Sequence, residues 1–184
     1  QDVEGLISLL GGEQRFSQKL DSLFLVKGNM GEEASPDISG LIGMYAHGNE
    51  PGHHITYLYN YVGQPWKTAD KVRFITDNFY TAKPDGIIGN EDVGQMSAWH
   101  VFSTLGFYPL NPANGAYVFG SPAIKHATIQ LAGGKTLTIE AKNNSAKNKY
   151  IQAITLNGKA YSKSYIMHQE LLQGGTLTFE MGPT

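Results

Sequence analysis

The spacing of apolar residues divides the chain into two parts. Over residues 2 to 105 apolar side chains recur at intervals of three and four, and this period places them on one face of each of several helices. From residue 117 onward the pattern changes to alternation, which is typical of strands with one buried face. Examples are Leu20, Leu23 and Phe24 in the first part, and Leu137, Ile139, Leu177 and Phe179 in the second. We therefore expect an α+β chain with its helices first.

Glycine and proline mark the links between these elements. Breaks in the first part, from 11–12 to 84–86, leave helices of about 10 to 15 residues, and helices joined by short links pack as antiparallel hairpins. In the second part, glycine and asparagine pairs such as Asn157-Gly158 fall at hairpin spacing, which predicts an antiparallel β-sandwich portion. Two prolines in the segment 108–112 should stop the last helix. We place the domain boundary there, with a helical unit at 1–110 and a sandwich unit at 111–184.

Composition narrows the classes of function. The 14 basic and 16 acidic residues show no run of one sign, which argues against nucleic acid or an anionic membrane as the main partner. No stretch approaches the ~20 apolar residues of a membrane helix, and the absence of cysteine excludes disulfides and thiolate metal sites. Because the chain begins at Gln1 and opens almost directly into a helical pattern, we expect it to be a segment of a longer protein.

Polar residues crowd the predicted links at 31–33, 48–54 and 89–95. In a ring of helix hairpins such links can gather at one end and line a common pocket. In the third link Asn90, Glu91 and Asp92 precede a helix predicted from Gly94 to Leu105. A carboxylate held at this position can activate a water molecule.

Asp92 has a second interpretation. Its spacing to Gln95 is that of a capping box, in which the aspartate accepts a helix N–H and the glutamine reaches back. The two roles are compatible, because a capping hydrogen bond would also keep the carboxylate ionised and therefore basic.

The second link has an unusual helix start. Pro51 suits the first helical position, which leaves Glu50 at a capping position where Ser, Thr, Asp or Asn serves better. Asn49 and Glu50 can instead turn oxygen atoms toward one point, as an oxygen-loving cation requires; the alternative is a solvated helix start. His53 and His54 cannot face the same way on a helix, so such a pair is more often one packed and one exposed histidine than a functional unit.

Other polar and aromatic residues carry weaker signals. Glu32 and Glu33 could bind sugar hydroxyls or form an exposed acidic loop. Trp66 is a potential platform for a sugar ring, whereas Trp99 has the helical spacing of a core residue. Lys67 and Arg73 could hold a carboxylate or a hydroxyl, although most such residues are simply solvated.

Three segments together resemble glycoside hydrolase family 92. They are Gly-Asn-Glu-Pro-Gly-His-His-Ile at 48–55, Lys-Thr-Ala-Asp-Lys-Val-Arg at 67–73, and a third set that runs from Pro-Asp-Gly at 84–86, through Gly-Asn-Glu-Asp-Val-Gly-Gln-Met-Ser-Ala-Trp at 89–99, to Leu-Gly-Phe-Tyr-Pro at 105–109. The resemblance implies a calcium-dependent exo-α-mannosidase that inverts configuration, built on an (α/α)6 barrel joined to a β-sandwich. It also implies a mannose-containing glycan as substrate and a periplasmic, cell-surface or secreted protein.

The resemblance also implies roles for individual residues. Asp92 corresponds to the general base and Asn90 to a residue that orients the water, although relatives can carry Asp at the latter position. Asn49 and Glu50 correspond to the Ca²⁺-binding segment. Substrate contacts are implied for Glu32 and Glu33, which lie in a loop that selects the linkage, and for His53 and His54 beside the site.

The family's general acid is a glutamate upstream of the segment at which this chain begins, so we expect the chain alone to be inactive. An inverting glycosidase needs two carboxyl groups on opposite faces of the scissile bond, and only one is implied here. Two alternatives stay open. The chain could belong to another (α/α)-barrel class, such as polysaccharide lyases or glucoamylase-like hydrolases, or it could be a non-catalytic sugar-binding or structural unit.

Overall fold

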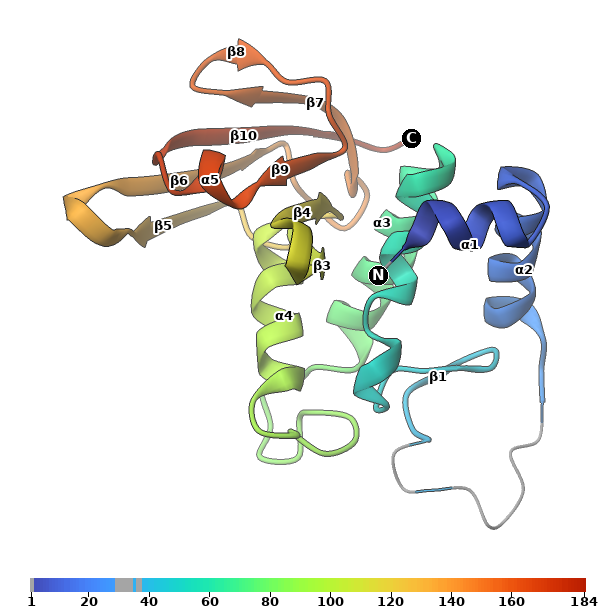
Figure 1. The fold of residues 1–184 in the computed structure, drawn as a ribbon. Coiled ribbons are helices and arrows are strands. Elements are labelled where there is room, and N and C mark those ends of the chain that lie inside the picture. Colours follow the sequence, from blue (N-terminus) through green and yellow to red (C-terminus); the bar gives the residue numbers. More distant parts are fainter. Residues whose placement is uncertain (1, 29–34, 36–37) are drawn as a thin grey trace.

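The helices of the N-terminal part pack on one side of two β-sheets (Figure 1). The computed structural model describes residues 2–28, 35 and 38–184 of the chain, so Glu32 and Glu33 lie outside the described residues. Within this part the order of elements is helical first and mainly β afterwards, as the change of hydrophobic period predicts. No helix within the described ranges has both the length and the apolar character to cross a membrane.

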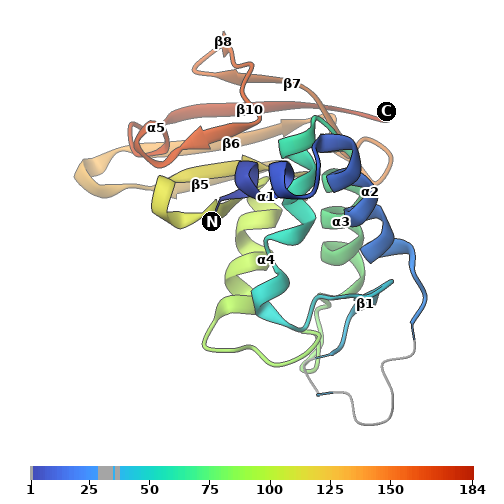
Figure 2. The same cartoon turned by 45° about the vertical axis from the view of Figure 1, so that its right-hand side comes forward.

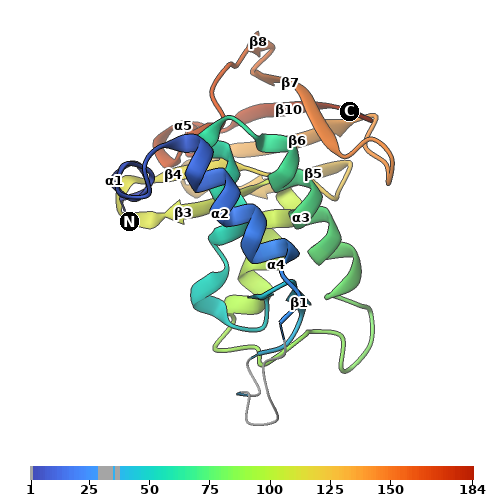
Figure 3. The ribbon, with the colours of Figure 1, turned by 90° about the vertical axis from the view of Figure 1, so that its right-hand side faces the viewer.

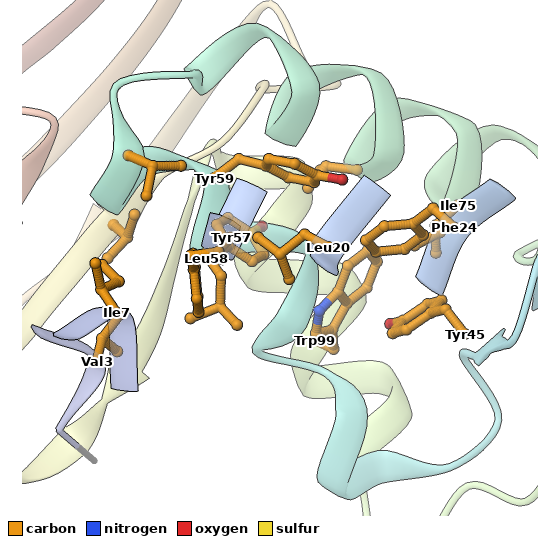
Figure 4. Packing of buried hydrophobic residues seen from close by; sticks show 14 residues of the cluster. Val3, Ile7, Leu20, Phe24, Tyr45, Tyr57, Leu58, Tyr59, Ile75 and Trp99 are labelled. Atoms are coloured by element: carbon orange, nitrogen blue, oxygen red, sulfur yellow. The ribbon is translucent and has the colours of Figure 1, made fainter. Parts of the chain in front are cut away.

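The described residues of the helical part form four α-helices and a long 3-10 segment. The α-helices are α1 (Val3–Leu9), α2 (Glu13–Leu25), α3 (Pro65–Asn78) and α4 (Gln95–Leu105), and the 3-10 helices before α3 are η1 (Glu50–Gly52) and η2 (Ile55–Val62). Aromatic and aliphatic residues from all of these except η1 form one buried cluster (Figure 4), in which Trp99 is fully buried. Trp99 is therefore a core residue, as its spacing predicts.

The link between α2 and η1 departs from the helical expectation. It contains a short antiparallel hairpin of β1 (Leu41–Ile42) and β2 (Tyr45–Ala46). Gly43 sits at φ +61° against the end of α2, where an added Cβ would lie 2.5 Å from the carbonyl carbon of Phe24. Only glycine fits so close to that backbone, and the N–H of Met44 then donates to the carbonyl of Leu23 at 2.8 Å. The apolar residues at 41–46 therefore belong to a hairpin and not to a helix.

The second part contains two sheets. The five-stranded sheet has the order β5-β6-β10-β7-β8, and the three-stranded sheet has the order β3-β4-β9. The strands of the larger sheet are β5 (His126–Gln130), β6 (Thr136–Lys142), β7 (Tyr150–Leu156), β8 (Lys159–Ala160) and β10 (Gly175–Gly182). Those of the smaller sheet are β3 (Phe107–Asn111), β4 (Ala116–Phe119) and β9 (Tyr165–Met167), and short helices η3 (Pro112–Asn114), η4 (Ala132–Gly134) and α5 (His168–Leu171) lie between strands.

The two sheets enclose a second buried cluster, which makes this part a sandwich. Phe107 and Phe119 from the smaller sheet join Ile139, Leu177 and Phe179 from the larger one. The expectation of a purely antiparallel sandwich is wrong at one pair, because β6 and β10 run parallel. Alternation along a strand identifies its buried face, but it carries no information on the direction of the neighbouring strand.

The last helix ends differently from the expectation. Gly106, at φ +103°, terminates α4, whereas Pro109 lies inside β3 and Pro112 begins η3. Within β3, Phe107 belongs to the second cluster and Tyr108 packs against the first. A division at residues 110 and 111 therefore stays a prediction, since β3 contributes to both cores.

The links that carry the polar motifs lie at one end of the helical part. In Figures 1 and 2, the segment that contains β1 and the segment from α3 to α4 are both at the end farthest from the five-stranded sheet. The view in Figure 3 agrees, with α2, α3 and α4 between these links and the sheets. The fold thus separates a loop-rich end from the sandwich.

Candidate functional site

Two of the polar links are in direct backbone contact. Gly89 has φ +75°, and an added Cβ there would lie 2.9 Å from the Cα of Gly48 and 3.2 Å from its carbonyl oxygen. The turn before η1 and the turn before α4, which are about forty residues apart in sequence, therefore touch at two glycines. This contact brings the candidate cation-binding residues Asn49 and Glu50 into the neighbourhood of the Asp92 loop, as the expectation of a common site requires.

The Asp92 loop has a strained backbone. Asp92 and Val93 have φ of 47° and 56°, and Gly94 follows at 94°. A left-handed backbone conformation is rare for a β-branched residue such as Val93, and residues with such strained backbones cluster at functional sites. Val93 is fully exposed and packs against nothing that would offset the strain. The strain is consistent with a functional role for this loop.

Glu91, and not Asp92, caps helix α4. The carboxylate of Glu91 accepts from the N–H of Ser97 at 3.1 Å and from its hydroxyl at 2.8 Å. The predicted capping box of Asp92 and Gln95 is therefore wrong, because a neighbouring carboxylate already holds the first turn. The Asp92 side chain is exposed and has no hydrogen-bond partner among the described residues. This geometry excludes the capping interpretation of Asp92, and its catalytic role stays a prediction.

Asn49 and Glu50 have unused oxygen atoms. Asn49 precedes η1 without a side-chain capping bond. Within the described ranges neither side chain makes a hydrogen bond or ion pair, although both are half-buried. Such oxygen donors suit a hard cation such as Ca²⁺, which takes carboxylate, amide and water ligands. No group of three His, Asp or Glu side chains suited to a metal ion occurs in the part of the chain that the structure describes, so these two residues can supply only part of a coordination shell.

The two adjacent histidines have opposite environments, as the packed-and-exposed interpretation predicts. His54 is exposed, whereas His53 is 1% exposed. The Nε2–H of His53 donates to the carbonyl of His47 at 2.9 Å, and its Nδ1 accepts from the amide of Gln95 at 3.0 Å. Burial lowers the pKa of His53 and favours this neutral form. Both ring nitrogens are therefore engaged inside the protein, which is at odds with the expected contact between His53 and substrate.

Sequence reasoning missed a buried histidine next to the site. His47 is fully buried, with Nδ1 2.9 Å from the hydroxyl of Tyr45 and Nε2 2.8 Å from that of Tyr80. Because the Tyr80 hydroxyl donates to the carbonyl of Met96 at 3.1 Å, His47 donates from Nε2 and accepts at Nδ1. Burial lowers its pKa to about 3. The sequence offers one signal for this histidine. Tyr45 and His47 are two residues apart, which places both side chains on the same face of an extended segment.

The remaining candidates lie elsewhere. Asn90 is exposed on the Asp92 loop. Trp66 is 50% exposed and lines a cavity of about 460 Å³ between α3 and the sandwich, away from the two loops. The expectation of solvated cations is wrong for Arg73, which is buried and donates to the carbonyl of Pro122 at 2.9 Å. Lys67 is half-buried and forms an ion pair with Asp21 at 2.7 Å.

Comparison with known proteins gives the family. The family model of the glycosyl hydrolase family 92 catalytic domain matches residues 1–183. A protein of Arthroderma benhamiae described as an uncharacterized secreted glycosidase is 34% identical over 184 residues, which make up 98% of this chain and 22% of that protein.

Solved structures agree with the family match. A family GH92 α-mannosidase from Bacteroides thetaiotaomicron superposes with a TM-score of 0.91 at 43% identity, covering 100% of this chain and 24% of that one. A family GH92 inverting mannosidase from the same organism gives a TM-score of 0.85 at 40% identity, with coverage of 100% and 26%. The chain thus spans about a quarter of the length of these relatives. The family match also decides against the alternatives of a polysaccharide lyase or a glucoamylase-like hydrolase. The chain belongs to glycoside hydrolase family 92.

Proposed function

We propose that the chain is part of an α-mannosidase that removes terminal α-linked mannose from glycans by hydrolysis with inversion. The names of the structural relatives support this reaction, and one of them is a complex of a family GH92 α-mannosidase with mannoimidazole. The description of the Arthroderma relative as secreted supports an extracellular or periplasmic location for the whole protein. In that protein, α1 to α4 would form part of an (α/α)6 barrel.

Asp92 is proposed as the general base. The observation that carries this role is that Asp92 has a free, exposed carboxylate on a strained turn, while the adjacent Glu91 caps the helix. An ionised carboxylate can take a proton from water as the water attacks the anomeric carbon. Asn90, exposed on the same loop, can orient that water through its amide.

The general acid is proposed to lie outside this chain. In an inverting glycosidase a second carboxyl group protonates the leaving oxygen from the opposite side of the sugar, about 6.5 to 9.5 Å from the base. General acid catalysis contributes roughly 10² to 10⁴-fold in rate. The chain without that group is therefore expected to show little or no activity.

Asn49 and Glu50 are proposed to hold Ca²⁺. Their half-buried oxygen atoms have no partner among the described residues, and further ligands would come from water, substrate or the rest of the protein. A calcium ion bound there would supply positive charge to the mannose hydroxyls and favour the flattened ring of the transition state. The protein's own contribution is to place these two residues beside the Asp92 loop through the Gly48–Gly89 contact.

The proposal is tested in the whole protein with a matched pair of variants. Asp92→Asn removes the base, whereas Glu91→Gln removes a charge one position away and retains an oxygen that accepts from Ser97. We expect kcat on an α-mannoside to fall by at least about 10²-fold for Asp92→Asn and by less than tenfold for Glu91→Gln. Proton NMR of the first product should show β-mannose. Unchanged kcat in Asp92→Asn would contradict the assignment, and α-mannose as first product would exclude inversion.

A further inference from the structure

His53 joins the turn before η1 to the start of α4. Its ring receives an N–H from Gln95 at Nδ1 and gives one from Nε2 to the carbonyl of His47. Its backbone repeats the connection, since its carbonyl accepts from the indole N–H of Trp99 at 3.1 Å and its N–H donates to the carbonyl of Glu50 at 3.0 Å. One buried residue thus has bonds to the 47–50 turn on one side and to α4 on the other.

Gln95 continues this connection to the Asp92 loop. It is the first residue of α4, and its N–H donates to the carbonyl of Asp92 at 3.2 Å. The path from Glu50 to Asp92 therefore passes through two residues, His53 and Gln95, by successive hydrogen bonds. This path is separate from the van der Waals contact of Gly48 with Gly89.

The residue types match the geometry. The side-chain amide nitrogen of Gln95 donates both to Nδ1 of His53 at 3.0 Å and to the hydroxyl of Tyr108 at 3.2 Å. Glutamine has two N–H donors on one atom, which glutamate lacks. Tyr108 is fixed in turn by stacking on the ring of Tyr57, at 5.2 Å between centroids, and His53 stacks on His47 at 4.6 Å. Packing on both sides therefore limits the movement of the pair.

We infer that His53 and Gln95 form a positioning clamp, which sets the distance between the Asn49–Glu50 turn and the Asp92 loop. This inference rests on the roles proposed above for those residues. Both ring nitrogens of His53 are engaged within the protein, so the clamp acts by holding the proposed cation-binding turn and the proposed base in register. A displacement of ~1 Å between catalytic groups can cost about 10²-fold in rate. Loss of the clamp should therefore lower kcat without unfolding the protein.

Two variants break the clamp from opposite sides. Gln95→Leu removes the donor and keeps the volume of the side chain, and His53→Phe removes both ring nitrogens and keeps the stacked ring. The control is Ser103→Ala, which removes a buried hydrogen bond of 2.7 Å to Tyr57 in the same helical core. The bond that it removes is buried and involves neither His53 nor Gln95.

The first measurement is independent of enzymatic activity. Amide hydrogen exchange in the whole protein should accelerate at least tenfold over residues 47–54 in both clamp variants, and it should change less than twofold there in Ser103→Ala. Equal acceleration in the control, or none in the clamp variants, would overturn the inference. A wild-type protein without mannosidase activity would instead contradict the proposed function, and the exchange result would still decide on the clamp.

The second measurement tests coupling and the catalytic consequence. Each clamp variant should lower kcat on an α-mannoside by at least about tenfold, whereas Ser103→Ala should lower it by less than twofold. The double variant should be no slower than the slower single variant, because both changes remove the same connection. Effects on kcat that multiply in the double variant, or that appear only in KM, would contradict a shared positioning role.

Discussion

The contact between Gly48 and Gly89 predicts a large effect from one added methyl group. In Gly89→Ala the new Cβ would lie 2.9 Å from the Cα of Gly48, well inside the ~3.5–4.0 Å at which carbon atoms pack best. The residue would also keep φ +75°, which costs an L-residue about 1–2 kcal/mol. Relief of the overlap adds about 1–3 kcal/mol, or it separates the turn before η1 from the Asp92 loop.

Gly63→Ala is the matched control for this substitution. Gly63 has a similar φ of +66°, but an added Cβ there meets nothing within 4 Å. It should therefore show only the conformational cost, ~1–2 kcal/mol. Thermal unfolding and kcat/KM on an α-mannoside are measured for both variants in the whole protein. We expect Gly89→Ala to be the less stable variant and to lose at least about tenfold in kcat/KM, with Gly63→Ala near the wild-type value. Equal stability and equal activity would refute the argument that the two loops depend on this contact.

Three further predictions concern the same end of the helical part. Tyr80→Phe leaves the buried N–H of His47 without its acceptor and should destabilise by about 1–3 kcal/mol, whereas Tyr117→Phe, which loses an exposed bond, should be nearly neutral in thermal unfolding. The pKa of His47 is lowered to about 3 by burial and by nearby His53 and His100. Between pH ~6.5 and pH ~3 this histidine is therefore protonated in the unfolded chain and neutral in the folded protein. Stability should therefore fall from pH ~6.5 toward pH ~3, with a contribution from His47 of up to about 1.4 kcal/mol per pH unit. Melts of His47→Phe across this range should show a smaller slope than wild type. A chelator should abolish activity and Ca²⁺ should restore it, and Glu50→Gln should raise the Ca²⁺ concentration required for half-maximal activity; activity indifferent to the chelator would contradict the calcium site.

The sequence was most informative where local signals agree. Helix α4 begins and ends within one residue of its predicted bounds, because glycines at 94 and 106 adopt left-handed conformations at its two ends. The switch from helical to alternating periodicity correctly predicted the order of the elements, with helices first and strands afterwards, since it reports which face of each element is buried. The family resemblance is confirmed by the match over residues 1–183.

Non-local contacts account for the errors. The hairpin at 41–46 depends on the approach of Gly43 to α2, and the parallel β6–β10 pair joins strands far apart in sequence. The capping assignment failed because two carboxylates, Glu91 and Asp92, precede α4, and only the three-dimensional turn decides which of them reaches Ser97. Arg73 looked like a surface cation, since its buried acceptor at Pro122 is 49 residues away.

The sequence predicted part of the candidate site. The two links expected to share one end of the helical part do so, and they touch at Gly48 and Gly89. The prediction of one packed and one exposed histidine at 53 and 54 is confirmed, but nothing in the sequence indicates the hydrogen bond between His53 and Gln95. Glu32 and Glu33 lie outside the described residues, so their contact with substrate stays a prediction.

The central claim is that the carboxylate of Asp92 deprotonates the attacking water, and chemical rescue tests it most directly. Azide is a nucleophile that needs no deprotonation, so it can attack the anomeric carbon as the glycosidic C–O bond breaks and the general acid protonates the leaving oxygen. In the whole protein, Asp92→Ala should hydrolyse an activated α-mannoside at least about 10²-fold more slowly than wild type. Added azide should then accelerate the variant at least about tenfold and yield β-mannosyl azide. Normal turnover of Asp92→Ala in water, without azide, would contradict the claim.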